Sequence, residues 1–315
     1  MGFEALLGNE QLKENLNRSI CSGHISHFYL ISGPEGSGRH TLARLLAAAI
    51  LCRERSKPCL HCGPCRKVMA GNHPDFITVE DPEHKNVAVK IVRQFREDVF
   101  IRPNESDRKI YLFPQELGTE GQNALLKILE EPPKYGVFIL LTDNPEKLLP
   151  TVRSRCTELA LRPLPEGTLT RALQREFPNA AAGDLAAAAA RSGGFLGQAT
   201  KLLQEGAALP QSTLDFAAAF GNRDALALTR LLAPMEKWKR DQLIPTLESW
   251  VQLLGEALAY RSGIRALSDA ARTLGTQCSP AQLMAAIDTL RKGIEYAQGN
   301  ISPAAVCGWL TWELR

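Results

Sequence analysis

Apolar residues in the first half of the chain form short continuous runs separated by stripes of helical period. Such runs are typical of strands covered on both faces in a parallel sheet, and they lie at residues 28–32, 76–79, 110–113 and 137–141. Helical stripes lie at residues 9–22, at residues 91–100 and, after a glycine-rich loop, up to residue 50. This alternation of strands and helices predicts an α/β domain built on a parallel sheet.

A further helix is predicted to begin at Thr119. Gln122 follows three residues later, which is the spacing of a capping box. Apolar residues then recur on one helical face, and Pro132 and Pro133 end the helix. The strand over residues 137–141 comes next, followed by a polar loop and an arginine-bearing segment that ends at Cys156. We expect this stretch to be a central part of the domain.

The pattern changes after Cys156. Pro163 and Pro165 mark a boundary, and residues 166–204 are alanine-rich with helical periodicity that Gly193 and Gly194 interrupt. A connection is predicted over residues 205–212, and the remaining chain has helical character throughout. The pairs Ser279-Pro280 and Ser302-Pro303 are typical of helix starts, with serine as the N-cap and proline at the first helical position.

Length and charge restrict the class of protein only loosely. A chain of 315 residues is expected to form two or three domains, and a net charge of +3 is too small to indicate nucleic-acid binding by itself. No apolar run approaches 18 residues, and the segment MGFEALLG has the features of neither a signal peptide nor a myristoylation site. The prediction is therefore a cytoplasmic protein without a membrane partner.

Four of the eight cysteines are clustered with the spacing C-x6-C-x2-C-x2-C, at Cys52, Cys59, Cys62 and Cys65. The two overlapping C-x2-C intervals are typical of tetrahedral thiolate coordination. Four protein ligands would close the site, so we predict a structural zinc ion. His61 and His73 are possible substitute ligands, although His61 is expected to point away from its neighbours. The alternative is four free thiols in a surface loop.

The loop after the first strand has the glycine spacing of a phosphate-binding loop but not its chemistry; the residues concerned are Gly33, Gly36, Gly38, Arg39, His40 and Thr41. Arg39 stands where the motif has a lysine, and a planar guanidinium does not replace a compact ammonium. His40 stands where the motif has a magnesium-binding hydroxyl, and Thr41 lies one position too late, about 100° around the helix. The alternative is a glycine turn that only packs a helix on a sheet.

Three segments resemble the bacterial clamp-loader ATPase family, which contains the gamma/tau and delta-prime subunits of DNA polymerase III. They are residues 122–127 (QNALLK), 129–133 (LEEPP) and 149–156 (LPTVRSRC). The resemblance implies an α/β P-loop (AAA+) domain over residues 1–162, with a zinc module at about 52–73. It also implies a small helical lid over 163–207 and an all-α collar domain over 208–315, with Asn300 near the family's ending.

The resemblance also implies roles for individual residues. In the family, the Ser-Arg-Cys motif supplies an arginine finger to the ATP site of a neighbouring subunit, which assigns that role to Arg155. Hydrolysing relatives carry a sensor arginine where this chain has Gly197, and they carry acidic residues where it has Pro114 and Gln115. Glu116 is the nearby carboxylate and is expected to be out of register. We predict that this chain neither hydrolyses ATP nor binds it as a cofactor.

The resulting hypothesis is a non-hydrolysing, delta-prime-like clamp-loader subunit. Its expected partners are the gamma/tau ATPase subunits and the delta subunit, and the sliding clamp and primer-template DNA through the assembled complex. Arg93 and Arg96 either face that DNA or are solvated surface charges, and the second interpretation is favoured. One alternative function is an active gamma/tau-type ATPase with relaxed motifs. Another is a stand-alone zinc-containing nucleic-acid-binding protein, which the small net charge argues against.

Overall fold

The computed structural model describes residues 2–84, 86–204, 209–263, 268–299 and 301–314. Within these residues one sheet is found, with five strands that are all parallel and lie in the order β2-β3-β4-β1-β5. The strands are β1 (Phe28–Ser32), β2 (Phe76–Thr78), β3 (Lys109–Phe113), β4 (Gly136–Thr142) and β5 (Thr157–Ala160). β5 is the strand that the apolar pattern missed, because only Leu159 of its four residues is buried.

The central strands bury side chains on both faces, as their continuous apolar runs predict. Tyr29 and Ile31 of β1 enter one core, whereas Phe28 and Leu30 enter the other. β3 and β4 divide their side chains in the same alternating way. Neighbouring residues of a strand point to opposite faces, so a strand without polar positions must be covered on both sides.

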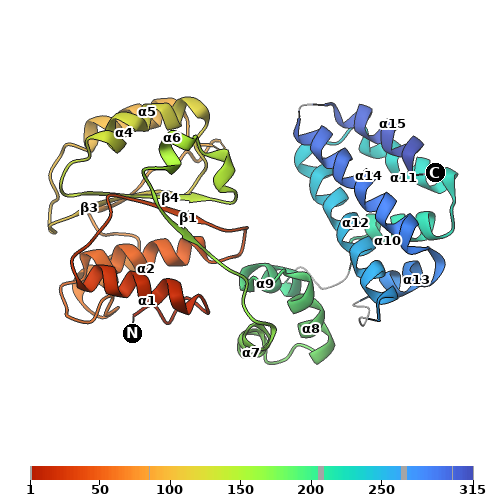
Figure 1. Cartoon of the computed structure of the whole chain (residues 1–315), viewed down its shortest axis with the longest axis horizontal. Helices are drawn as coiled ribbons and strands as arrows, with labels where there is room; N and C mark the ends of the chain where they lie inside the picture. The colour runs from red at the N-terminus through yellow and green to blue at the C-terminus, as the bar shows by residue number, and fades with distance from the viewer. Residues whose placement is uncertain (1, 85, 205–208, 264–267, 300, 315) are drawn as a thin grey trace. The chain divides into compact units, whose positions relative to one another are not determined.

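Helices cover the two faces of the sheet (Figure 1). On one face lie α1 (Glu10–Cys21) and α2 (Arg39–Leu51), with α3 (Gly63–Met69) packed on α2. On the other face lie α4 (Val89–Asp98), α5 (Thr119–Glu130) and α6 (Pro150–Arg153), the last after a 3-10 turn, η1 (Pro145–Lys147). The predicted AAA+-type α/β fold is confirmed, although α4 begins and ends two residues before the predicted range.

The predicted capping box of α5 is wrong. Gly118 occupies the N-cap position, and no side chain caps this helix end. Gln122 is instead buried, with 4% of its surface exposed, because it lies on the same helical face as Leu125 and Leu129. Because Gly118 is the N-cap, Gln122 is the fourth residue of the helix, whereas a capping box needs the third. Its amide bonds instead to the chain before α5 and to the chain before α6.

The chain divides into two compact units, Met1–Ala180 with Ser192–Leu202, and Ala181–Arg191 with Leu203–Arg315. The first unit contains the sheet, α7 (Glu166–Glu176) and most of α9 (Leu196–Gln204). The second contains α8 (Ala182–Arg191). Gly193 and Gly194 interrupt the helices between α8 and α9, as predicted, and both have positive φ angles. The division into base, lid and collar domains stays a prediction.

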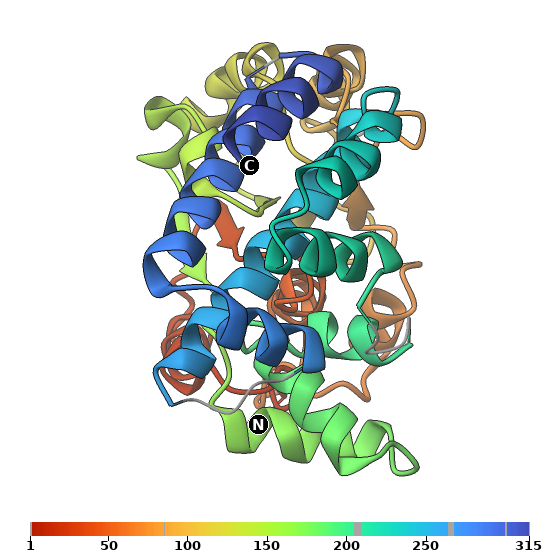
Figure 2. The ribbon, with the colours of Figure 1, turned by 90° about the vertical axis from the view of Figure 1, so that its right-hand side faces the viewer.

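The second unit is wholly helical in its described residues. After α8 it contains α10 (Gln211–Gly221), α11 (Ala225–Met235), α12 (Arg240–Arg261), α13 (Asp269–Gln277), α14 (Pro280–Gln298) and α15 (Pro303–Glu313). α12 and α14 pack along each other (Figure 2). The fully buried Trp250 stacks on Phe216, with ring centroids 4.3 Å apart.

Two sequence predictions for the second unit are confirmed. The Ser279 hydroxyl accepts from the backbone N–H of Gln282, and the Ser302 hydroxyl accepts from that of Ala305. Of the predicted connection over 205–212, residues 205–208 lie outside the described part of the chain, as does Asn300, and α10 already includes residue 212. Among the described residues, no helix has the length and apolar character needed to cross a membrane.

Candidate functional site

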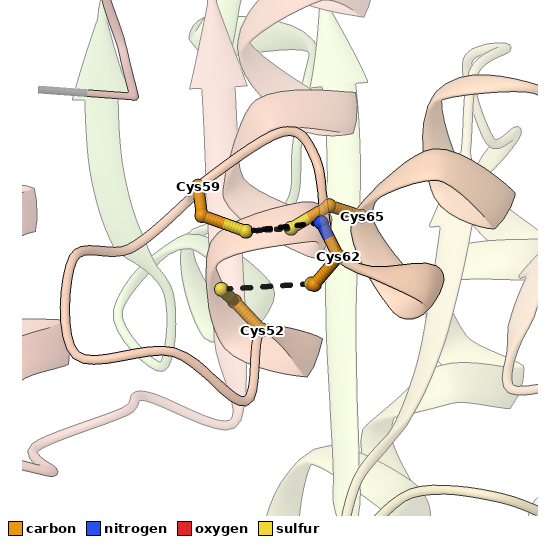
Figure 3. A group of neighbouring side chains, drawn as sticks. All are labelled: Cys52, Cys59, Cys62 and Cys65. Atoms are coloured by element: carbon orange, nitrogen blue, oxygen red, sulfur yellow. Dashed lines mark hydrogen bonds between the residues drawn. The ribbon is translucent and has the colours of Figure 1, made fainter.

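The four clustered cysteines converge between α2 and α3 (Figure 3). Cys52 directly follows α2, Cys62 is the N-cap residue of α3, Cys65 lies within α3, and Cys59 lies in the connecting loop. Their sulfur atoms all lie within 4.8 Å of one another, and the Cys52–Cys62 and Cys59–Cys65 pairs are 4.0 and 3.9 Å apart. A tetrahedron with zinc–sulfur bonds of about 2.3 Å has edges of about 3.8 Å. The cluster is therefore compatible with one metal ion.

The surroundings of the cluster stabilise at least one thiolate. Burial opposes ionisation of Cys59, but hydrogen bonds from the backbone N–H groups of Cys62 and His61 lower its pKa to about 6. The Cys62 N–H lies 3.3 Å from the Cys59 sulfur. Burial raises the pKa of Cys52 and Cys65, and a bound cation would offset that cost.

Neither candidate histidine belongs to this sulfur group. The His61 ring is exposed, and its Nδ1 lies 2.8 Å from the Cys59 carbonyl oxygen. His73 is buried, and its Nδ1 accepts from the backbone N–H of Asp75. The group of possible metal ligands found among the described residues contains only the four cysteines.

The cysteine cluster is tied to the loop before β3. Lys67 on α3 forms an ion pair with Glu105, with 2.6 Å between Nζ and Oε2, and Arg53 donates to the Glu105 carbonyl oxygen. The fully buried Asp75 accepts from the backbone N–H groups of three successive residues, Asn104, Glu105 and Ser106. The metal candidate and this loop therefore form one connected structure.

The glycine loop joins β1 to α2, with Gly38 as the N-cap residue and Arg39 as the first residue of the helix. It borders a cavity of about 460 Å³ that the N-terminal segment, α7 and the start of α9 also line. His40 and Thr41 line the same cavity. This geometry retains the strand, loop and helix of a phosphate-binding site, with a guanidinium and an imidazole at the two positions that the motif gives to lysine and a hydroxyl.

Side chains at the end of β3 are engaged in structural contacts. Gln115 accepts from the Asp81 N–H at 2.7 Å and donates to the carbonyl oxygens of Asp81 and His84. Glu116 is not isolated, because the Lys147 ammonium lies 3.0 Å from it and 2.8 Å from Asp143. Burial and the adjacent Asp143 raise the pKa of Glu116. Lys147 therefore supplies a fixed positive charge beside both carboxylates.

Arg155 follows α6 at the surface, with 39% of its side chain exposed. Its Nη1 donates to the Thr151 carbonyl oxygen at 2.9 Å, and its Nη2 lies 3.4 Å from Glu130 at the end of α5. The neighbouring Arg153 instead pairs with Glu146 and Glu158. The two arginines of this motif therefore have separate partners.

Gln122 is the residue that sequence reasoning assigned wrongly. Its Nε2 donates to the carbonyl oxygens of Leu117 (2.8 Å) and Lys147 (3.1 Å), and its Oε1 accepts from the Leu149 N–H (2.7 Å). This amide fixes the segment that carries Lys147 and leads to Arg155. The available signal was the apolar stripe, which places Gln122 in line with Leu125 and Leu129 and thus predicts a buried amide.

Arg93 is exposed and Arg96 half-buried on α4. The prediction that these two arginines are solvated surface charges is not tested, because a test needs the chain bound to DNA.

The sheet order, the glycine loop and the helices on both faces define a P-loop α/β protein of the AAA+ type. A family profile described as "DNA polymerase III, delta subunit" matches residues 8–165, half of the chain. The chain therefore belongs to this family of DNA polymerase III clamp-loader subunits. The match lies in the part of the chain that contains the sheet, the cysteine cluster and Arg155.

Curated relatives include both kinds of subunit. The chain is 35% identical over 152 residues to the DNA polymerase III delta' subunit of Bacillus subtilis, covering 47% of this chain and 46% of the relative. It is 36% identical over 178 residues to the gamma/tau subunit of Mycobacterium tuberculosis, covering 55% of this chain and 31% of the relative. The matches thus span less than half of either relative.

Among solved structures, a DNA polymerase III gamma subunit-related protein from Thermotoga maritima aligns over 97% of this chain and 100% of its own. The identity is 19% and the TM-score is 0.41.

Replacing Gln122 by leucine should destabilise the first unit. The change leaves the Leu149 N–H and two carbonyl oxygens without their partner, at a cost of about 2 kcal/mol. We expect the melting temperature of this unit to fall by roughly 4–8 °C in calorimetry, with faster amide exchange over residues 145–155. Gln94→Leu, at an exposed position of α4, is the control. A melting temperature equal to that of the control would contradict this role.

Proposed function

We propose that this chain is a delta-prime-type, non-hydrolysing subunit of a bacterial DNA polymerase III clamp loader. In this role it supports ATP hydrolysis in a neighbouring gamma/tau subunit through Arg155. The observation that carries the proposal is a contrast between two places in the same domain. The side chains that would serve the chain's own phosphate site are replaced or engaged, whereas the Ser-Arg-Cys arginine is kept at the surface.

The first half of the contrast is a site without its magnesium ligands. Hydrolysis in P-loop enzymes depends on a lysine at the phosphates, a hydroxyl on magnesium and an acidic residue at the end of a neighbouring strand. Here Arg39 and His40 occupy the first two positions, and Gln115 is bound to the loop before α4. Glu116 already has an ammonium partner in Lys147, so a second cation there would compete with a fixed charge.

The second half is the availability of Arg155. Its contact with Glu130 joins two half-exposed groups at 3.4 Å, and surface pairs of this kind contribute about 0–1 kcal/mol. A γ-phosphate on a neighbouring subunit would therefore compete easily for the guanidinium. Arginine fingers that stabilise the developing charge in this way are worth about 10³–10⁵ in rate in small GTPases. Intramolecular pairing is thus compatible with a role in trans.

The proposed partners follow from the family. They are the gamma/tau ATPase subunits and the delta subunit, and the sliding clamp and primer-template DNA through the assembled complex, in the cytoplasm. We assign residues 1–162 to the base domain, 163–207 to the lid and 208–315 to the collar that would join the ring. The second candidate function is an active gamma/tau-type ATPase with relaxed motifs, and the 36% identity to a gamma/tau subunit favours it.

The metal proposed for the cysteine cluster is structural zinc. Four thiolates at tetrahedral spacing leave no open position for a substrate or an activated water, which is typical of structural sites. Zinc is a soft enough cation to prefer thiolate ligands, and its binding would add to the stability of the connected loop around Glu105.

The folded chain should contain about one zinc ion, measured by elemental analysis after removal of loosely bound metal. Cys59→Ser should lose most of it, because three thiolates hold the ion less tightly than four. Cys21→Ser is the matched control, since Cys21 is exposed and lies on α1. Zinc contents of the two variants that do not differ would rule out this ligand set.

The purified chain should show no ATP turnover above background, and Arg39→Lys should not restore it. The magnesium ligands would still be missing at His40 and Gln115, so a single ammonium cannot rebuild the site. A coupled phosphate-release assay measures this directly. Steady turnover by the wild-type chain that disappears on substitution of Gly38 or Arg39 would instead support the gamma/tau-type alternative.

In a reconstituted clamp loader, Arg155→Ala should lower DNA-stimulated ATP turnover at the adjoining site at least tenfold, a part of the rate that a finger can supply. Arg155→Lys should rescue it poorly, because an ammonium does not reproduce the planar fork. The variant should fold, retain its metal and assemble as wild type does.

Arg153→Ala is the matched control, because this neighbouring arginine pairs with Glu146 and Glu158 and should affect turnover little. Unchanged turnover in the Arg155→Ala ring would eliminate the finger role, and failure of that variant to assemble would make the residue structural.

A further inference from the structure

The start of α9 touches the glycine loop through main-chain atoms. The backbone N–H of Gly197 donates to the Gly36 carbonyl oxygen at 3.0 Å. A Cβ built on Gly36 would lie 2.4 Å from the Gln198 nitrogen, and one on Gly197 would lie 2.7 Å from the Gly36 Cα. Both distances are too short for any side chain, so each of these positions requires glycine while the contact exists.

We infer that Gly36 and Gly197 form a main-chain latch that closes the glycine loop against α9 without a nucleotide. The inference concerns the state of this chain's own loop and goes beyond the proposed role of Arg155. The biological role of the latch rests on the proposed loss of hydrolysis, because a subunit that does not exchange nucleotide has no need to open this contact.

The hydrogen bond solves a local problem of α9. The first N–H groups of a helix have no partner within the helix, and Gly197 is the second residue of α9. The Gly36 carbonyl oxygen satisfies this group and lies at the positive end of the helix dipole. In a phosphate-binding site, that end of a helix is suited to an anion. Here the Gly36 carbonyl oxygen occupies the position that an anion would take.

The latch gives a positive reason for glycine at position 197. The family resemblance implies a sensor arginine at this position in hydrolysing relatives, and loss of that arginine alone would allow any small or polar residue. Gly36 itself has a φ of +75°, a conformation that L side chains rarely adopt. Because each Cβ would meet backbone, which cannot turn aside as a side chain can, the contact depends on both glycines.

Side chains around the latch add little to it. Lys201 lies 3.6 Å from Glu35, but both groups are more than half exposed, so their attraction is screened. The latch should therefore respond to backbone substitution and hardly at all to removal of this ion pair.

The wild-type chain provides the first test, by site-resolved amide exchange in the absence of nucleotide. We expect the Gly197 N–H to exchange at least about 100-fold more slowly than an unstructured amide. Its partner is outside α9, so helix formation alone cannot give this protection. Exchange at the unstructured rate, or protection that develops only when magnesium and ATP are added, would overturn the latch.

The second test compares two glycine-to-alanine variants of the full chain. Gly197→Ala should accelerate exchange of the α9 amides at least about tenfold, because the new Cβ separates α9 from the loop. Gly167→Ala on α7 is the control, since a Cβ there meets nothing within 4 Å. Equal exchange in a folded Gly197→Ala chain would overturn the inference, and the wild-type measurement decides the matter if that variant does not fold. Neither readout involves Arg155 or ATP hydrolysis, so the latch and the finger fail independently.

Discussion

The buried amide of Gln122 holds together three segments of the first unit, including the segment that carries Lys147 and leads to Arg155. Its three hydrogen bonds fix the chain before α5 and the chain before α6 to the same helix. Lys147 and Arg155 lie on the segment so held, and the far end of α5 carries Glu130, which contacts Arg155. An amide can satisfy carbonyl and N–H groups together, whereas an apolar residue of the same size would leave all three backbone groups without this partner.

Residues around the glycine loop and the end of β3 are engaged in contacts within the chain. Gln115 binds the loop before α4, Lys147 sits beside Glu116 and Asp143, and α9 donates to the glycine loop. Each contact provides a polar group of this region with a partner within the chain. These contacts do not require a bound ligand. Positions at which the chain departs from the family pattern, such as Gln115 and Gly197, are therefore engaged in contacts within the chain.

The cysteine cluster lies on the opposite face of the sheet from α5. Cys52 and Cys65 belong to the same core as α2. Lys67 of α3 pairs with Glu105, which lies in a loop whose backbone N–H groups donate to the buried Asp75. A carboxylate that accepts three successive N–H groups is stabilised by them, and it gives the loop a defined shape. A metal ion in the cluster would thus stabilise a region larger than its four ligands. The helical second unit has a core of its own, centred on Trp250.

The sequence by itself determined the features that depend on local order. Apolar runs located β1, β3 and β4, serine–proline pairs located the starts of α14 and α15, and cysteine spacing located the sulfur cluster. Periodicity, capping and ligand spacing are properties of neighbouring residues, so a single chain displays them. The tertiary structure decided the role of Gln122, the pairing of Lys147 with Glu116, the approach of Gly197 to Gly36 and the position of β5 at the sheet edge. These features depend on which strand ends meet and how closely two backbones pack, and residues 25 to 161 positions apart in the chain carry no local sign of that.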